Sequence, residues 1–234
     1  MASNPLSVRN LCAERADERG AVESLIEFTY QFQPGYFYEI RGENPVGKNL
    51  LLQTLGLRVP ATSGEIFVDG ISLANLDLDE LSDVRNRKFG FLFSAPFLLP
   101  AFTVLENVAM PLFKIAQVET PEAKLITEEI LDMTGITEIS DASIEELGAL
   151  EQMLTALARA MIHHPRVLIA EDVGNHLSAV AATQLLNSMR RCSQRLGVTV
   201  IATLADQISW QLSDVSLEVR PKCVEEFVRN NPTG

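Results

Sequence analysis

The chain has 234 residues, 47% of them hydrophobic, and 31 Asp and Glu outnumber 19 Lys and Arg, for a formal net charge of -12. Nucleic-acid binding draws on clustered Lys and Arg, so this acidic globular composition predicts no nucleic-acid partner. The three cysteines, Cys12, Cys192 and Cys223, are too scattered for a disulfide framework or a zinc site, which indicates a reducing cytoplasm. We expect Cys192 to be an unpartnered thiol on a helix surface.

The most apolar stretch, Phe89 to Leu112, is interrupted by Pro96, Pro100 and Glu106. It cannot supply the roughly 20 apolar residues of a membrane-spanning helix. Met1 to Asn10 contains no apolar core of a signal peptide, so we expect a protein that is not secreted.

Segments rich in β-branched and aromatic residues alternate with helical patterns, which is typical of an α/β fold with parallel strands. The predicted strands are Tyr36 to Arg41, Glu65 to Val68, Lys88 to Phe93, Arg166 to Glu171, Val198 to Thr203 and Val215 to Val219. The run from Val167 to Ala170 has no polar residue before Glu171, as expected of a strand covered on both faces. Its carboxyl end should face a ligand crevice.

Between Ser94 and His164 the strand pattern gives way to helical patterns, which indicates a helical insertion. Three helix starts are predicted from capping patterns, namely Thr103 with Glu106, Ser143 with Glu146, and Thr120 followed by Pro121. The helix expected after Ser143 carries apolar residues at helical spacing, and we expect this face to pack inward: Leu147, Leu150, Leu154, Leu157 and Met161.

A phosphate-binding loop is predicted directly after the strand that ends at Arg41. The segment reads Gly42-Glu43-Asn44-Pro45-Val46-Gly47-Lys48-Asn49 and opens a helix rich in leucine. In such a loop, backbone N–H groups surround phosphate oxygens, the Lys reaches the terminal phosphates, and a hydroxyl after the Lys ligates magnesium. We expect any nucleotide to be held by Gly42, Asn44, Gly47, Lys48, Asn49 and Leu50.

Two residues of this loop depart from that design. Pro45 has no N–H to donate, and Asn49 places an amide oxygen where a hydroxyl is expected. The loop therefore either binds nucleotide, with Mg²⁺ at Asn49, or keeps only its shape, with Lys48 exposed to solvent or paired to an acid.

With this loop in place, the chain resembles the ATP-binding-cassette (ABC) ATPase subunits, and among them the lipoprotein-releasing, macrolide-export and cell-division type. The resemblance covers nearly the whole chain. Its landmarks are Leu6 to Leu11, Ser63 to Gly70, Arg87 to Phe91, Leu98 to Pro100, Thr103 to Val108 and Ala156 to Ala160. It implies a P-loop NTPase core with a mainly parallel sheet, an antiparallel β element near the N-terminus and an inserted helical subdomain. It also implies ATP and Mg²⁺ as cofactors.

The resemblance also implies a domain plan and partners. The chain would be one nucleotide-binding domain over residues 1–234, with an α/β core at 1–93 and 165–229, a helical subdomain at 94–164 and a tail at 230–234. Such subunits form homodimers or heterodimers that close over two nucleotides, and they lie on the cytoplasmic face of the membrane against a permease. The apolar segment from Ser94 to Val108 is the expected permease docking region, although its side chains could equally pack the helical subdomain onto the core.

Several positions that carry chemistry in the family differ here. Arg15 stands where an aromatic residue stacks on adenine, Ser94 where a glutamine senses the metal, and Ala205 where a histidine contacts the γ-phosphate. The signature loop reads Leu147-Gly148-Ala149-Leu150-Glu151-Gln152, Val173 replaces a proline, and Ser178 replaces an aspartate. The family's order of a metal-binding Asp and a general-base Glu is reversed, as Glu171 and Asp172. A shift of about 1 Å in such a group can cost roughly 100-fold in rate.

The resemblance makes Asp172 and Glu171 the candidate catalytic residues, with Asn49 and Glu171 the candidate metal ligands. These departures favour a catalytically inactive cassette that acts as a structural or regulatory subunit of a membrane transporter assembly. The alternative is a subunit that binds ATP and hydrolyses it slowly to energise such a transporter.

Overall fold

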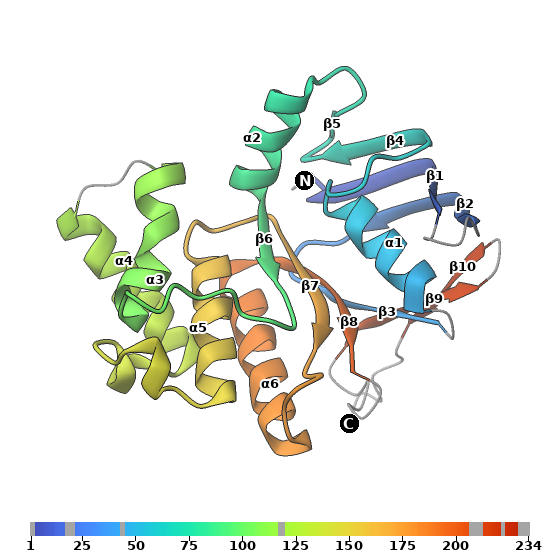
Figure 1. The fold of residues 1–234 in the computed structure, drawn as a ribbon. Helices are drawn as coiled ribbons and strands as arrows, with labels where there is room; N and C mark the ends of the chain where they lie inside the picture. Colours follow the sequence, from blue (N-terminus) through green and yellow to red (C-terminus); the bar gives the residue numbers. More distant parts are fainter. Residues whose placement is uncertain are drawn as a thin grey trace, which may run out of the picture.

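A six-stranded, largely parallel sheet lies at the centre of the computed structural model, and a four-stranded antiparallel sheet packs beside it (Figure 1). The structure describes residues 3–16, 22–42, 45–116, 120–205, 213–220 and 223–228. The strands are β1 (Leu6–Ala16), β2 (Val22–Phe32), β3 (Phe37–Arg41), β4 (Ser63–Val68), β5 (Ile71–Ser72), β6 (Phe89–Leu92), β7 (Val167–Val173), β8 (Thr199–Leu204), β9 (Val215–Arg220) and β10 (Cys223–Val228). The predicted tail, residues 230–234, lies outside the described ranges.

The helices gather mainly on one side of the larger sheet (Figure 1). They are α1 (Pro45–Leu55), α2 (Leu78–Lys88), α3 (Val104–Pro111), α4 (Thr120–Thr134), α5 (Ala149–Met161) and α6 (Ala179–Leu196), with a π-helical turn at Leu112–Ala116 and 3₁₀ turns at Thr137–Ile139 and Ile144–Glu146. The capping box of Thr103 and Glu106 opens α3, as predicted. The box of Ser143 and Glu146 opens the second 3₁₀ turn instead of α5, which begins at Ala149.

The larger sheet has the strand order β10-β9-β3-β8-β7-β6, and only β10 is antiparallel to its neighbour. The smaller sheet has the order β2-β1-β4-β5 and is antiparallel throughout. All six predicted strands are present, with ends that differ by one or two residues. The sequence pattern alone predicted none of β1, β2 and β10.

The missed strand β1 contains bulges that break the alternation of apolar and polar residues. Its pairing with β2 shifts register between Val8 and Leu11 and again between Leu11 and Ala13, and Asn10 lies in the left-handed region with φ 49°. A bulge adds one residue to a strand, so the period of two that marks a half-buried strand is lost in the sequence.

Two hydrophobic cores lie on opposite faces of the larger sheet. In β7, Val167 and Ile169 point to the core shared with α1 and the antiparallel sheet, while Leu168 and Ala170 point to the core under α3 to α6. All four are buried, which confirms the prediction that this strand is covered on both faces.

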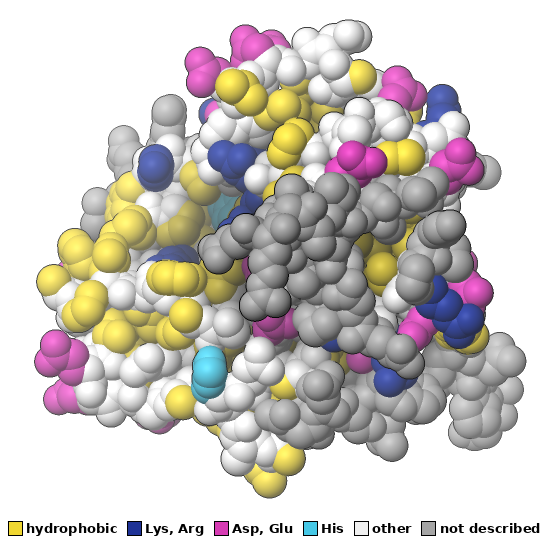
Figure 2. Space-filling view, turned by 45° about the vertical axis from the view of Figure 1, so that its right-hand side comes forward, with side chains coloured by type: hydrophobic (Ala, Val, Ile, Leu, Met, Phe, Trp, Pro, Cys, Tyr) yellow, Lys and Arg dark blue, Asp and Glu magenta, His cyan; other side chains and the backbone are white. Residues whose placement is uncertain are grey.

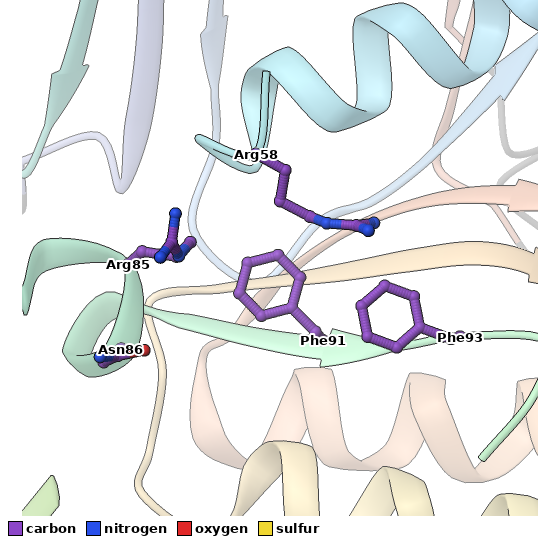
Figure 3. A pocket seen from close by; sticks show the side chains of 5 residues that line it. All are labelled: Arg58, Arg85, Asn86, Phe91 and Phe93. Carbon is purple, nitrogen blue, oxygen red and sulfur yellow. The ribbon is translucent and has the colours of Figure 1, made fainter. Parts of the chain in front are cut away.

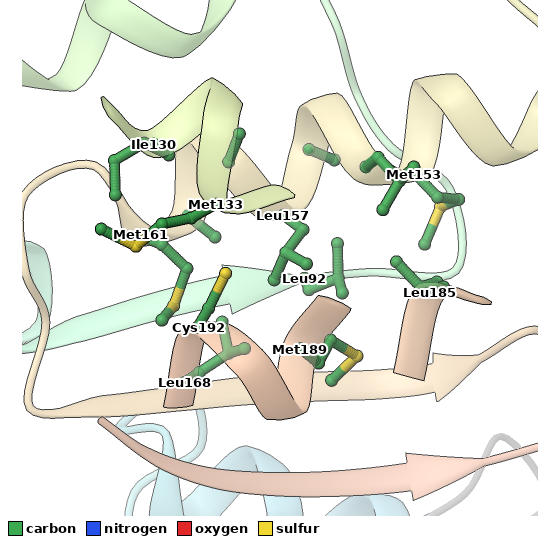
Figure 4. Close-up of a cluster of buried hydrophobic side chains, with 14 of the residues drawn as sticks. Leu92, Ile130, Met133, Met153, Leu157, Met161, Leu168, Leu185, Met189 and Cys192 are labelled. Carbon is green, nitrogen blue, oxygen red and sulfur yellow. The ribbon is translucent and has the colours of Figure 1, made fainter. Parts of the chain in front are cut away.

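The helical core is rich in flexible side chains (Figure 4). The buried face of α5 lies in this core. Four methionines also lie in it, namely Met133, Met153, Met161 and Met189. Cys192 of α6 points into the same cluster and is fully buried, so the expectation of a surface thiol was wrong. Burial raises the pKa of the Cys192 thiol to about 11 against the opposing effect of Arg191 and Arg195.

Candidate functional site

The predicted phosphate-binding loop connects the parallel strand β3 to α1. Gly42 ends the strand with φ 148°, and a Cβ at this position would lie 2.5 Å from the backbone oxygen of Val219 in β9. Only glycine fits such a close approach at that backbone angle. Asn44 lies outside the described residues, and the positions of Gly47, Lys48 and Asn49 in the first turns of α1 are described.

Asn49 carries the clearest mark of an incomplete site. Its side-chain oxygen Oδ1 is buried and accepts no hydrogen bond from the described residues. A buried acceptor without a donor costs free energy, so such an atom is normally satisfied by an ordered water, an ion or a ligand. Mg²⁺ binds oxygen ligands, commonly from carboxylates, phosphates and water, and an amide oxygen can take one of these positions.

Lys48 and Leu50 take different environments on either side of Asn49. Lys48 makes no ion pair among the described residues. Burial raises the pKa of Glu39, and the charges of Arg41 and Lys48 oppose this rise only in part. Leu50 is buried in the core between the sheets. Its side chain therefore cannot reach a ligand, and only its backbone remains available for the predicted nucleotide contact.

The two candidate carboxylates lie on a bulge at the end of β7. The pairing of β7 with β8 shifts register between Ala170 and Val173, and Asp172 has φ 49°. Bulges beside functional sites redirect side chains, and a residue other than glycine at positive φ is uncommon. The carboxyl end of the buried strand thus presents Glu171 and Asp172 from irregular backbone.

Each carboxylate is held by hydrogen bonds within the chain. Gln53 of α1 donates Nε2 to Glu171 Oε1 at 3.2 Å, and Arg58 donates Nη1 to Glu171 Oε2 at 2.9 Å. The Thr203 hydroxyl of β8 accepts from the Asp172 backbone N at 2.8 Å and donates to Asp172 Oδ1 at 3.2 Å. Gln53 lies one helical turn after Asn49, so α1 connects the loop to Glu171.

Residues that replace family motifs differ in exposure. Ala205 is buried, and its backbone N donates to the Val173 carbonyl at 3.0 Å, while its methyl group can neither donate nor accept. Arg15 is exposed on β1 and donates to Gln53 Oε1 at 3.3 Å. No sequence pattern pointed to Gln53, Arg58 or Thr203 as site residues, because an isolated polar residue on a helix, loop or strand has no diagnostic spacing.

The signature segment opens α5. Gly148 is the N-cap residue, and its backbone N donates to the Glu151 carboxylate at 2.7 Å. Gln152 donates from its side chain to the carbonyl of Leu147 at 3.1 Å. The first turn of this helix is therefore closed by its own side chains.

Comparisons with known proteins place the chain in a family. A family model described as "ABC transporter" matches residues 25–173. The chain belongs to the ABC transporter family. It is 32% identical over 200 residues to the lipoprotein-releasing system ATP-binding protein LolD of Bacteroides fragilis (strain YCH46), covering 86% of this chain and 92% of LolD.

Other relatives agree with this assignment. The LolD protein of Anaeromyxobacter dehalogenans (strain 2CP-C) is 31% identical over 172 residues, which cover 74% of this chain and 72% of that protein. The dimeric structure of MJ0796, a bacterial ABC transporter cassette, has a TM-score of 0.80 at 23% identity and covers 95% of this chain and 98% of its own. The predicted ABC ATPase fold is thereby confirmed. No helix within the described ranges is long and apolar enough to cross a membrane.

Proposed function

We propose that the chain is the ATP-binding, slowly ATP-hydrolysing subunit of a membrane transporter of the lipoprotein-releasing type. The single observation that carries this proposal is the loop between β3 and α1, where Gly42 lets the chain pass close to the β9 backbone before α1 begins and Asn49 Oδ1 is buried without a donor. The likeness to LolD over most of both chains supports the same proposal. These features fit a nucleotide phosphate and its Mg²⁺.

The residues of the loop divide the work of binding. Gly47 and the backbone of the first turn of α1 would face the phosphates with N–H groups, and Lys48 would add a positive charge. Asn49 Oδ1 and Glu171 would supply oxygens to the metal. Bound Mg²⁺-ATP supplies the phosphoryl group that is transferred, and the metal neutralises its charge.

A second candidate function is an assembly subunit without turnover, which was our first expectation from the sequence. The comparisons favour the hydrolysing subunit over this one. Three observations support the second candidate: Glu171 is paired to Arg58, Asp172 is bound to Thr203, and Ala205 has no group to orient water or phosphate.

We further propose that the segment from Ser94 to Val108 docks onto a permease subunit at the cytoplasmic face of the inner membrane. Hydrophobic side chains gather over the helical part of the molecule, on the left of Figure 2. Phe97, Leu99 and Phe102 of this segment are exposed. Phe97 also has φ 46°, and a bulky residue in that conformation is strained, which points to a functional constraint.

A partly buried arginine and a buried asparagine hold this segment in shape. Arg159 of α5 donates to the carbonyl oxygens of Pro96 at 2.7 Å and Phe97 at 2.9 Å. Asn107 of α3 is fully buried, accepts from the Leu99 backbone N at 2.8 Å and donates to the Leu99 carbonyl at 3.1 Å. A loop held this firmly can present apolar side chains to a partner without collapsing onto the core.

The test compares Lys48→Ala with Lys114→Ala, which removes an exposed lysine in the π-helical turn. At ATP concentrations about 100-fold above Kd, Mg²⁺-ATP should stabilise the native chain by about 2.7 kcal/mol, or roughly 5–11 °C in Tm. Lys48→Ala should abolish this shift and Lys114→Ala should retain it. Phosphate release that depends on Lys48 supports the hydrolysing subunit. Binding without release, or absence of any shift, refutes the hydrolysing subunit and supports the second candidate.

A further inference from the structure

We propose that Arg58 is an internal counter-ion that competes with a divalent cation for Glu171, so that the metal binds more tightly when Arg58 releases this carboxylate. The inference rests on the proposed function, since it assigns a regulation to the same site. Arg58 lies in the turn after α1, outside the phosphate-binding loop. It is a positioning residue because it acts through Glu171.

Both oxygens of the Glu171 carboxylate are already occupied. Oε1 accepts from Gln53 at 3.2 Å, and Oε2 accepts from Arg58 at 2.9 Å. The Glu171 side chain is 19% exposed, so the interaction is only partly screened by solvent. A Mg²⁺ ion that approaches this carboxylate competes with these donors for its lone pairs, and the guanidinium charge repels the ion.

Arg58 also contacts an aromatic ring. Its guanidinium lies over the Phe93 ring, 4.7 Å from the ring centroid, which is a cation–π contact. Figure 3 shows Arg58 above Phe91 of β6 and Phe93, which follows that strand, beside a pocket of about 330 Å³ that Arg85 and Asn86 also line. A rotation of the side chain within this pocket would keep the aromatic contact while it frees Glu171.

The aromatic contact extends toward the proposed docking segment. The rings of Phe93 and Phe97 meet edge to face with centroids 5.8 Å apart, and Phe97 is exposed. A continuous path of contacts therefore runs from Phe97 through Phe93 and Arg58 to Glu171. A partner that moves Phe97 would change the environment of Arg58 and, through it, the metal affinity of Glu171.

The experiment measures the affinity for ATP in EDTA and in excess Mg²⁺, using the full chain. For Arg58→Gln, we expect the ratio of the two affinities to rise about fivefold above the native ratio, the upper end for a partly exposed ion pair. Arg85→Gln is the matched control, since it removes the same charge from the same pocket. The native Arg85 donates to the Leu57 carbonyl and to Ser82, and not to Glu171. Its ratio should equal the native one.

An unchanged ratio in Arg58→Gln overturns the inference, and so does an equal rise in both variants, because net charge alone would then explain it. Arg58→Met keeps the apolar stem beside Phe93 and should give the same rise if Arg58→Gln folds poorly. In the absence of nucleotide, the effects of Arg58→Gln and Glu171→Gln on urea unfolding should be non-additive, and additive effects also overturn the inference. Failure of ATP to bind in EDTA speaks against the proposed function. The double-mutant cycle measured by urea unfolding still tests whether Arg58 and Glu171 interact.

Discussion

Replacing Phe97 by aspartate tests whether the segment Ser94 to Val108 serves docking or packing. Phe97 is 69% exposed, so of the roughly 200 Å² that a phenylalanine offers, about 60 Å² is buried. At about 25 cal/mol per Å² this burial stabilises the fold by about 1.5 kcal/mol. Aspartate tolerates positive φ better than phenylalanine, and the relief of strain at φ 46° should offset about half of the loss.

We therefore expect Phe97→Asp to lower the free energy of unfolding by less than about 1 kcal/mol. Leu98, in contrast, is partly buried against the helical core, and Leu98→Asp should cost more than about 2 kcal/mol because it buries a carboxylate. Urea denaturation of the purified variants measures both values. The two roles that the sequence left open for this segment thus fall on different residues, since Phe97 is exposed and Leu98 packs against the helical core.

The assay for docking is the share of the chain that sediments with membranes containing its permease. Phe97→Asp should lower this share severalfold while the urea midpoint stays near the native value, with Leu125→Asp as a control on an exposed leucine of α4. If Phe97→Asp destabilises the fold as much as Leu98→Asp, the residue belongs to the core. If it folds normally and still sediments with the membranes, the docking proposal is refuted.

Three further predictions concern the fold around the site. Gly90→Ala places a Cβ 2.2 Å from a backbone oxygen of α5 and should cost about 3 kcal/mol in urea unfolding. Partial burial alone would raise the pKa of Asp69, but Lys88 and Arg166 outweigh burial and lower it, so Asp69→Asn should cost about 1 kcal/mol at pH 7. This difference should begin to shrink as the pH falls below the ordinary aspartate pKa of about 4 and should vanish only below the lowered pKa of the folded chain, because stability from a lowered pKa is lost when the folded-state carboxylate is protonated. The thiol of Cys192 should resist alkylation at pH 8 in the native state, since its pKa is raised to about 11, and should react in urea.

Local sequence patterns determined the parts of this protein that depend on neighbours along the chain. Continuous apolar runs marked the buried strands, such as Val167 to Ala170, because a strand covered on both faces has no polar side. The glycine and lysine spacing marked the loop between β3 and α1, since phosphate binding needs backbone that only such spacing allows. The family resemblance added the antiparallel sheet, which the pattern of β1 and β2 had hidden in its bulges.

Only the tertiary structure decided which side chains meet. Arg58 follows α1 and Glu171 ends β7, and they are 113 residues apart in the chain, so no spacing rule could predict their ion pair. Cys192 was expected to be an unpartnered thiol on a helix surface, yet α6 turns it into the methionine-rich core. Burial and contact depend on how helices and sheets pack, and that packing minimises exposed apolar area over the whole chain at once.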